Sequence, residues 1–513
     1  MGIKKYIANQ DNTITNAYGV DLSTRATGSN MGASDILETF SIYGQQTTSS
    51  AELSRILVQF PVSTVSSDRL AGTIPVSGSV KFYLRMFNAR HSEQLPKDFT
   101  VNVLAVSQSW QEGYGLDMES YTDKTKDAIE GSNWANRNSL PAASWAQIGG
   151  DYHSSSYTPA ETMPNYTYTF TGGEDMELDV TAAVEEWIAG TQTNNGFGVF
   201  LTSSYEAYVA EAATNVLQNL EGVKKSFYTK RFFSRSSEFF FKKPALEARW
   251  DSRITDDRGN FYYSSSLAPP EDNLNTIYLY NYIRGRLKNI PGVDTGPILV
   301  SIYSGSSDDS APSDTKLELS LGGDVAAAAD LNATGGHVST GIYSASFAFT
   351  GSTSLKTIYD VWHSSGVEYV TGTISPKSFN SPGWNQYSEF TTKITNLKPS
   401  YNKDEIARFR TFVRERNTMP TIYNVASASP PMAIVPSASF EIIRMVDERT
   451  VIQNSTGSSD YHTYLSYDNS GSYFDLDMSL LEPGYMYGIK LALYSSNGWR
   501  EQEEVHKFRV ENN

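Results

Sequence analysis

The sequence predicts an all-β protein of three tandem β-sandwich domains. Short runs of alternating apolar and polar residues recur along the chain, and segments rich in Gly, Pro, Asn and Ser separate them, as expected of strands joined by turns. The 32 tyrosines and 24 phenylalanines suit half-buried sheet faces. The length of 513 residues corresponds to about three domains at the usual size of roughly 100–200 residues each. We find no internal repeat and no heptads.

One helix interrupts this pattern in the first domain, which we place at residues 1–250. Residues 178–201 combine a short helix, a glycine stop, a turn and a buried strand. Asp179 or Thr181 can cap the first turn, and Gly190 suits the left-handed position that ends a helix. The spacing i, i+4, i+7, i+8 predicts one apolar helix face, formed by Val180, Val184, Trp187 and Ile188.

Four pieces of the first domain occur in the order of one known family. They are the strand at 54–61, the strand at 101–110 that ends in Ser-Trp, the helix segment, and closing strands at 233–238 and 243–247. Together they resemble the DNRLRE-type β-sandwich, a family of extracellular and surface modules found in wall-associated proteins and in polysaccharide-binding modules. The resemblance implies a jelly-roll-type sandwich with one clamp helix, in which the loop-rich segment 111–175 covers an edge.

The second and third domains are placed at residues 251–395 and 396–513. Short strands are predicted in the second at 276–283, 298–304, 316–321, 341–349, 357–363 and 367–374, which suggests an immunoglobulin-like sandwich. The third has predicted strands at 408–414, 440–446, 461–467 and 486–494. Its segment from Leu481 to Tyr487 resembles the Leu-x-Pro-Gly-x-x-Tyr corner of fibronectin-like sandwiches, whose tyrosine belongs to the core.

Composition limits the kinds of partner and site that we expect for this chain. The net charge of −16 argues against nucleic-acid binding, which needs a basic field. The chain has no cysteine, so disulfides and thiolate metal sites are excluded. No signal peptide follows Met1, and no stretch approaches the roughly 18 apolar residues of a membrane span, so we expect no membrane partner.

The opening residues from Tyr6 to Ala17, together with the three-part layout, also resemble uncharacterised virion proteins of marine tailed phages. A phage protein made in the host cytoplasm and released by lysis needs no export signal. We therefore expect this chain to be located in a virion.

Four arginines at even positions form the first candidate site: Arg408, Arg410, Arg414 and Arg416. On a regular strand they share one face, opposite Ala407, Phe409, Thr411 and Val413. This face is either merely solvated or an assembly surface for an acidic neighbour. A polyanionic lipopolysaccharide is a third possibility.

A loop with several carboxylates is the candidate calcium site. Asp308, Asp309 and Asp314 supply hard oxygen ligands, but without the order or length of an EF-hand loop. A solvated hairpin loop is the alternative, and no other cofactor is expected.

Aromatic residues in the loops of the first domain are candidates for stacking on a sugar: Trp110, Tyr114, Trp134, Trp145, Tyr152 and Tyr157. Packing within the domain is the alternative for these residues.

No enzyme motif is present. The six histidines lack zinc spacing, and neither a GxSxG elbow nor a Walker loop occurs. We therefore expect a non-enzymatic structural protein of a tailed-phage particle, located at the neck, tail, baseplate periphery or capsid surface. Its expected partners are other virion proteins and further copies of itself. The alternative is a carbohydrate-binding adhesin or tail-fibre protein that recognises a cell-surface glycan. A polysaccharide-degrading enzyme with two carboxylates from distant parts of the chain is a third hypothesis.

Overall fold

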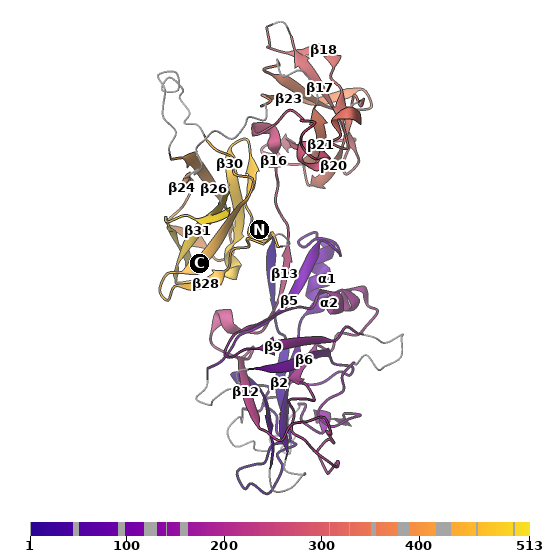
Figure 1. Cartoon of the computed structure of the whole chain (residues 1–513), viewed down its shortest axis with the longest axis vertical. Coiled ribbons are helices and arrows are strands. Elements are labelled where there is room, and N and C mark those ends of the chain that lie inside the picture. Colours follow the sequence, from indigo (N-terminus) through magenta and orange to yellow (C-terminus); the bar gives the residue numbers. More distant parts are fainter. Residues whose placement is uncertain are drawn as a thin grey trace. The chain divides into compact units, whose positions relative to one another are not determined.

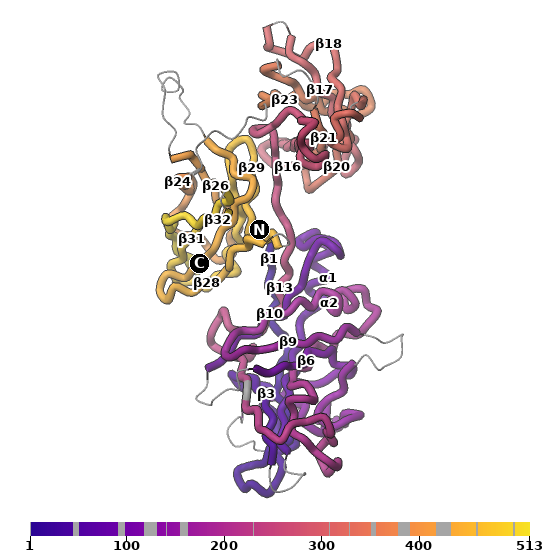
Figure 2. The backbone as a smooth tube through the Cα atoms, viewed as in Figure 1, coloured from indigo at the N-terminus to yellow at the C-terminus, as the bar shows by residue number. Residues whose placement is uncertain are grey.

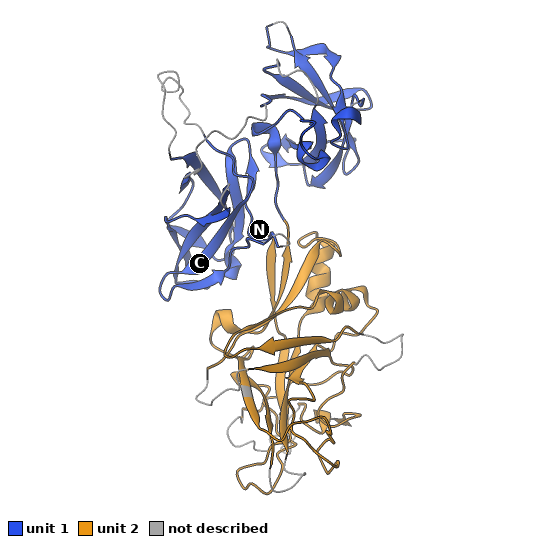
Figure 3. Ribbon diagram, viewed as in Figure 1, with its two compact units in different colours: residues 1, 252–513 blue, residues 2–251 orange. Residues whose placement is uncertain are grey.

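The computed structural model describes residues 2–44, 51–90, 98–116, 131–139, 141–153, 163–306, 308–327, 329–349, 355–377, 390–416, 432–457, 460–495 and 498–512. The chain divides into two compact units, one formed by residues 2–251 and the other by residues 1 and 252–513 (Figure 3). Parts of the predicted loop regions lie outside the described residues, namely 117–130, 140, 154–162 and 378–389.

Unit 2, residues 2–251, is a sandwich of two antiparallel sheets (Figure 1). The large sheet has the order β12 (Phe227–Phe233), β3 (Ile36–Ile42), β4 (Glu52–Gln59), β11 (Phe197–Leu201), β6 (Phe99–Ala105) and β9 (Tyr166–Phe170), and β2 (Gln10–Thr15) also pairs with β4. The small sheet has the order β1 (Ile3–Ile7), β13 (Ala245–Trp250), β5 (Val80–Met86) and β10 (Met176–Asp179). A separate hairpin joins β7 (Asn136–Ser139) to β8 (Ala142–Ser144).

The core of this sandwich follows from the alternation of its strands. On β5, Val80, Phe82, Leu84 and Met86 are buried, and they meet Ile56 and Val58 of β4 in one hydrophobic cluster. The other face of β4 carries Leu53 and Leu57, which belong to a second cluster with Trp110, Trp134 and Trp145. The large sheet is therefore covered on both faces, by the small sheet on one and by residues from 106–116, 131–139 and 141–152 on the other.

Two helices pack against the small sheet's side of the core. The predicted helix is α2 (Thr181–Ala189), and Gly190 ends it with a φ of +75°. The second helix, α1 (Val62–Leu70), contacts α2 (Figure 2). The expectation of a single helix is thus wrong, because α1 is rich in Ser and Thr and buries only Val62 and Val65, so no apolar stripe marks it in the sequence. Among the residues described, neither helix has the length and apolarity of a membrane span.

Unit 1 contains two groups of strands. In the first group the order is β14 (Asn275–Tyr280), β21 (Ile342–Phe349), β20 (Ala333–Ser339), β17 (Ile298–Gly305), β22 (Ile358–Ser364) and β23 (Val367–Ile374), with β18 (Pro312–Lys316) on β17 and β19 (Leu319–Ser320) on β21. A small hairpin joins β15 (Tyr282–Ile283) to β16 (Arg286–Leu287). Ile277 and Phe347 share one core with Ile302 and Trp362, so the sheet folds over its own inner face as a sandwich.

The last group forms two facing sheets. One has the order β24 (Phe390–Ile394), β26 (Ile406–Glu415), β30 (Gly471–Asp477) and β29 (Ser466–Asp468). The other has the order β25 (Ser400–Asn402), β33 (His506–Glu511), β31 (Met486–Ser495), β27 (Ala438–Arg444) and β28 (Arg449–Ile452), and β32 (Gly498–Glu501) pairs with β31. Between the sheets, the rings of Phe440 and Phe474 stack with centroids 4.1 Å apart.

The predicted tyrosine corner is present in this last sandwich. Tyr487 is fully buried, and its hydroxyl donates a hydrogen bond of 2.7 Å to the backbone oxygen of Glu482. Short 3₁₀ turns also occur between the strands, at Phe240–Lys242, Asp257–Gly259, Pro270–Asn273, Val325–Ala327 and Met478–Leu480. The prediction of an all-β chain of β-sandwich domains is confirmed.

Candidate functional site

The arginine strand has the predicted alternation. β26 buries Ala407, Phe409, Thr411 and Val413, while Arg408 and Arg414 are exposed and Arg410 is half-buried. Arg416 lies just beyond the end of the strand and is exposed. The shared face follows from the period of two in a strand, since the opposite face packs into the core of the third sandwich.

Two of these arginines are compensated within the chain. Arg408 donates two hydrogen bonds to Asp475, of 2.8 and 2.9 Å, and Arg410 donates one of 2.7 Å to Asp468. Both guanidinium groups lie over the ring of Tyr473, at 4.3 and 4.8 Å from its centroid. The hydrogen bonds that Arg408 donates to Asp475 raise the pKa of Arg408 above its usual value. The face is therefore not a uniform positive surface, because two of its four arginines are paired with carboxylates of neighbouring strands.

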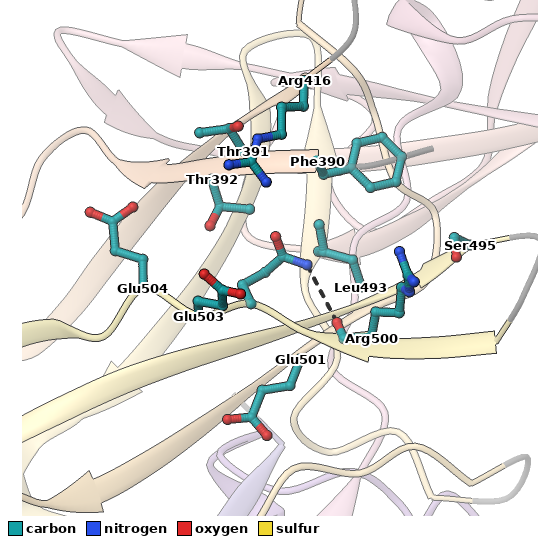
Figure 4. A pocket seen from close by; sticks show the side chains of 11 residues that line it. Phe390, Thr391, Thr392, Arg416, Leu493, Ser495, Arg500, Glu501, Glu503 and Glu504 are labelled. Atoms are coloured by element: carbon teal, nitrogen blue, oxygen red, sulfur yellow. Dashed lines mark hydrogen bonds between the residues drawn. The ribbon is translucent and has the colours of Figure 1, made fainter. Parts of the chain in front are cut away.

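Arg416 lines a groove of about 520 Å³ in the third sandwich (Figure 4). One wall is the edge strand β24, with Phe390, Thr391 and Thr392. The other wall comes from the end of β31 and from β32 with the residues after it. Leu493 lies there, together with the charged side chains of Arg500, Glu501, Glu503 and Glu504. Both signs of charge thus lie along one groove that has an apolar residue from each sheet.

The loop tryptophans are buried, so the expectation that they face a glycan is wrong. Trp110, Trp134 and Trp145 have exposed fractions of 6%, 0% and 5%. Each indole N–H donates to a backbone oxygen, that of Asn195, Asn215 and Asn133 respectively. They pack on the outer face of β4, which the sequence could not show to be covered. Tyr114 is exposed, at 71%, and Tyr157 lies outside the described residues.

Tyr152 lines a pocket of about 780 Å³ on this side of unit 2. The large sheet supplies Arg55, Leu104 and Phe200 to the pocket, and the loops supply the rest of its lining: Ser107, Gln108, Ala146, Gln147, Gly150, Asp151, His153, Gln192, Thr193, Asn195 and Leu217. Of these residues, only Tyr152 was a binding candidate from the sequence. The glutamines come from three separate loops, so no spacing in the sequence brings them together.

The charged groups that line the pocket form hydrogen bonds within the chain. Arg55 is 7% exposed and donates to Glu206, at 3.2 Å, and to the backbone oxygen of Gly149, at 3.1 Å. Burial opposes the charged guanidinium most strongly, but Glu206 and Tyr152 together outweigh it and raise the pKa of Arg55. Asp151 accepts hydrogen bonds from the backbone N–H groups of Ala146 and Gln147, at 2.7 and 2.8 Å. Burial raises the pKa of Tyr152 to about 12, so its hydroxyl stays protonated and donates to Gly149 at 2.9 Å.

In the candidate calcium loop, a carboxylate oxygen of Asp308 accepts hydrogen bonds from side chains of the same loop. Asp308 accepts hydrogen bonds from the hydroxyls of Ser306 and Ser310, both of 2.7 Å, and these bonds lower its pKa to about 2. Over the described part of the chain, no group of three or more His, Asp or Glu side chains is placed to hold a metal ion. Asp308, Asp309 and Asp314 do not form such a group, and calcium binding by this loop remains a prediction.

A serine–histidine contact occurs in the second sandwich. Ser301 Oγ lies 2.7 Å from His363 Nε2 and donates to Asn332 Oδ1 at 2.7 Å, which also accepts from Lys316. Ser301 is fully buried within β17. A substrate cannot reach a serine in that position, so the contact joins β17 to β22 rather than forming an accessible nucleophile.

Comparisons with known proteins add little to this description. No family model matches the sequence, and no curated protein matches it. Among solved structures, the two-domain immunoglobulin module of DIP-gamma is 11% identical with a TM-score of 0.13, covering 47% of this chain and 90% of that one. The Ig1-2 module of the Drosophila receptor protein tyrosine phosphatase DLAR is 8% identical with a TM-score of 0.14, covering 47% and 91%. The FN1–FN3 domains of chicken CNTN1 are 9% identical with a TM-score of 0.15, covering 56% and 82%. Scores this low carry no argument about function.

Proposed function

We propose that this chain is a non-enzymatic structural component of a tailed bacteriophage particle, located at the neck, tail, baseplate periphery or capsid surface. It works through multivalent contacts with other virion proteins and with further copies of itself. The observation that supports the proposal is the groove of the third sandwich, which lies beside an open sheet edge (Figure 4).

The groove suits an extended segment of a neighbouring protein. β24 is the last strand of its sheet and, among the described residues, pairs only with β26, so its outer edge offers backbone N–H and C=O groups to an added strand. Phe390, which is half-buried, gives that segment an apolar contact. Arg416 and Arg500 suit acidic side chains of the segment, and Glu501, Glu503 and Glu504 suit basic ones. Charges of both signs fix the register of a partner more than they add affinity.

Immunogold labelling of purified phage particles tests the location. Label at one fixed position is expected, and that position distinguishes the neck and capsid from a host-contacting tip. Protein that occurs in the lysate but never on particles would contradict the proposal.

The contact is tested by the double charge reversal Arg416→Glu with Arg500→Glu. The variant chain should fold normally, since neither side chain belongs to a core, but its incorporation into particles should fall at least tenfold. The matched control is Lys507→Glu, an exposed reversal on β33 of the same sandwich, outside the groove lining. Equal incorporation of both variants would exclude the groove as the assembly contact.

A second candidate function is carbohydrate binding, as in an adhesin or tail-fibre protein that recognises a cell-surface polysaccharide. The pocket of unit 2 favours it, because a concave site with aromatic and polar side chains is the usual form of a small-ligand site.

A further inference from the structure

We infer that the pocket of unit 2 binds a neutral, hydroxyl-rich sugar unit, and that it discriminates against acidic sugars. The inference deepens the second candidate function and rests on it. The pocket's volume of about 780 Å³ lies within the range of small-molecule sites.

The polar lining of the pocket consists mainly of uncharged groups that both donate and accept. Gln108, Gln147 and Gln192 each present a carboxamide, and Ser107 and Thr193 each present a hydroxyl. A carboxamide donates through its NH₂ group and accepts through its oxygen. Sugar hydroxyls also donate and accept, so such side chains can satisfy pairs of adjacent ring hydroxyls without any net charge.

The one arginine of the pocket is already neutralised. The Arg55 guanidinium is paired with Glu206, and the carboxylate of Asp151 is a further negative charge in the lining. A uronic acid or a sialic acid would have to leave water and approach these carboxylates, and Arg55, the only arginine or lysine among the described lining residues, is already paired. The charge balance of the site therefore favours a neutral ligand.

An apolar wall completes the site. The rings of Tyr152 and Phe200 lie 4.7 Å apart with an interplanar angle of 38°, and Leu104 and Leu217 also line the pocket. Such a wall suits the C–H face of a pyranose ring. The position of Tyr152 depends on Gly198 of β11, where an added Cβ would lie 2.1 Å from the tyrosine ring.

The test measures binding of the full chain to neutral polysaccharides (dextran, mannan and galactan) and to acidic ones (alginate and polygalacturonate) by affinity electrophoresis and titration calorimetry. At least one neutral polymer should bind, and Gln147→Ala and Gln192→Ala should each weaken it at least tenfold. Thr167→Ala, an exposed polar change on β9 outside the pocket, is the matched control and should leave binding unchanged. Circular dichroism melting of each variant shows that it has folded.

Three results would overturn the inference: binding to the acidic polymers alone, neutral binding that neither glutamine variant weakens, or no binding to any of the neutral polymers. None of these results bears on particle incorporation, which the Arg416→Glu and Arg500→Glu variant measures separately.

Discussion

Asp11 on β2 is a carboxylate without exposure to water, and its titration should be visible in the stability of unit 2. Its Oδ2 accepts a hydrogen bond of 2.6 Å from the backbone N–H of Arg235, and Glu112 lies close by and forms an ion pair with Arg235. Burial raises the pKa of Asp11 to about 7, and the charge of Glu112 acts in the same direction. The folded state therefore holds a proton on Asp11 that the unfolded state releases at lower pH.

The sign of the pH dependence follows from this. A raised pKa in the folded state stabilises the fold at low pH, and this contribution is lost as the pH rises from about 4 to about 7. Each tenfold change in proton affinity corresponds to about 1.4 kcal/mol. Asp11→Asn, which cannot ionise, should melt higher than the parent at pH 8, and the difference should shrink towards pH 5. Asp98→Asn, at an exposed position, is the control; a melting difference for Asp11→Asn that is independent of pH would contradict the assignment.

Single residues also show where sequence reasoning reaches its limit. The alternation of Arg408 and Phe409 predicted the two faces of β26 correctly, since the period of a strand is a local property. Whether Trp134 faced water could not be predicted, because its burial depends on β4 and on Asn215, which are distant in sequence. For the same reason, the Arg408–Asp475 pair was not foreseen.

At the scale of the element, α2 was predictable and α1 was not. The apolar face of α2 is buried at Val180, Val184 and Trp187, with Ile188 packed at its margin, and the glycine stop is as predicted. α1 has no such face, and its position is fixed by contacts instead: Arg69 donates two hydrogen bonds of 2.7 Å to Glu185 of α2. The two partners are 116 residues apart in the chain, so no spacing in the sequence indicates this pair.

Strands also differ in how far local sequence predicts them. β23 was predicted with its observed bounds, Val367–Ile374, from β-branched alternation. β20 (Ala333–Ser339) was missed, because its Gly335 and Gly336 have low strand propensity and its place in the sheet comes from pairing with β17 and β21. Tertiary pairing thus supplied what local propensity could not.

Trp187→Ala tests the role of α2 as the element that closes the core of unit 2. The indole is 5% exposed and lies 4.8 Å from the ring of Phe197, so its removal leaves a cavity between the helix and β11. We expect a loss of about 3–5 kcal/mol in the free energy of unfolding, measured by denaturant titration. Ala182→Gln, an exposed change on the same helix, should change it by less than about 0.5 kcal/mol. A Trp187→Ala chain as stable as the parent would show that the helix does not contribute to the core.

At the scale of the whole molecule, the chain has separate cores on either side of residue 251, and each should respond to its own substitutions. In unit 1, the buried pair of Arg258 and Asp360 reports on the stability of the core. Asp360 is fully buried, accepts hydrogen bonds of 2.5 and 2.7 Å from Arg258, and also accepts the indole N–H of Trp362 at 2.8 Å. Removing the cation would leave a buried carboxylate without its partner, at a cost of about 3–5 kcal/mol.

Calorimetry of the full chain can therefore distinguish the units. Arg258→Met should lower the transition of residues 252–513 and leave that of residues 2–251 in place, whereas Trp187→Ala should do the reverse. The control for the first variant is Arg286→Met, an exposed arginine on β16, which should move neither transition. If both core variants shifted a single common transition by the same amount, the two units would unfold as one cooperative block. A destabilising substitution in either unit would then lower the stability of the candidate sites in both units.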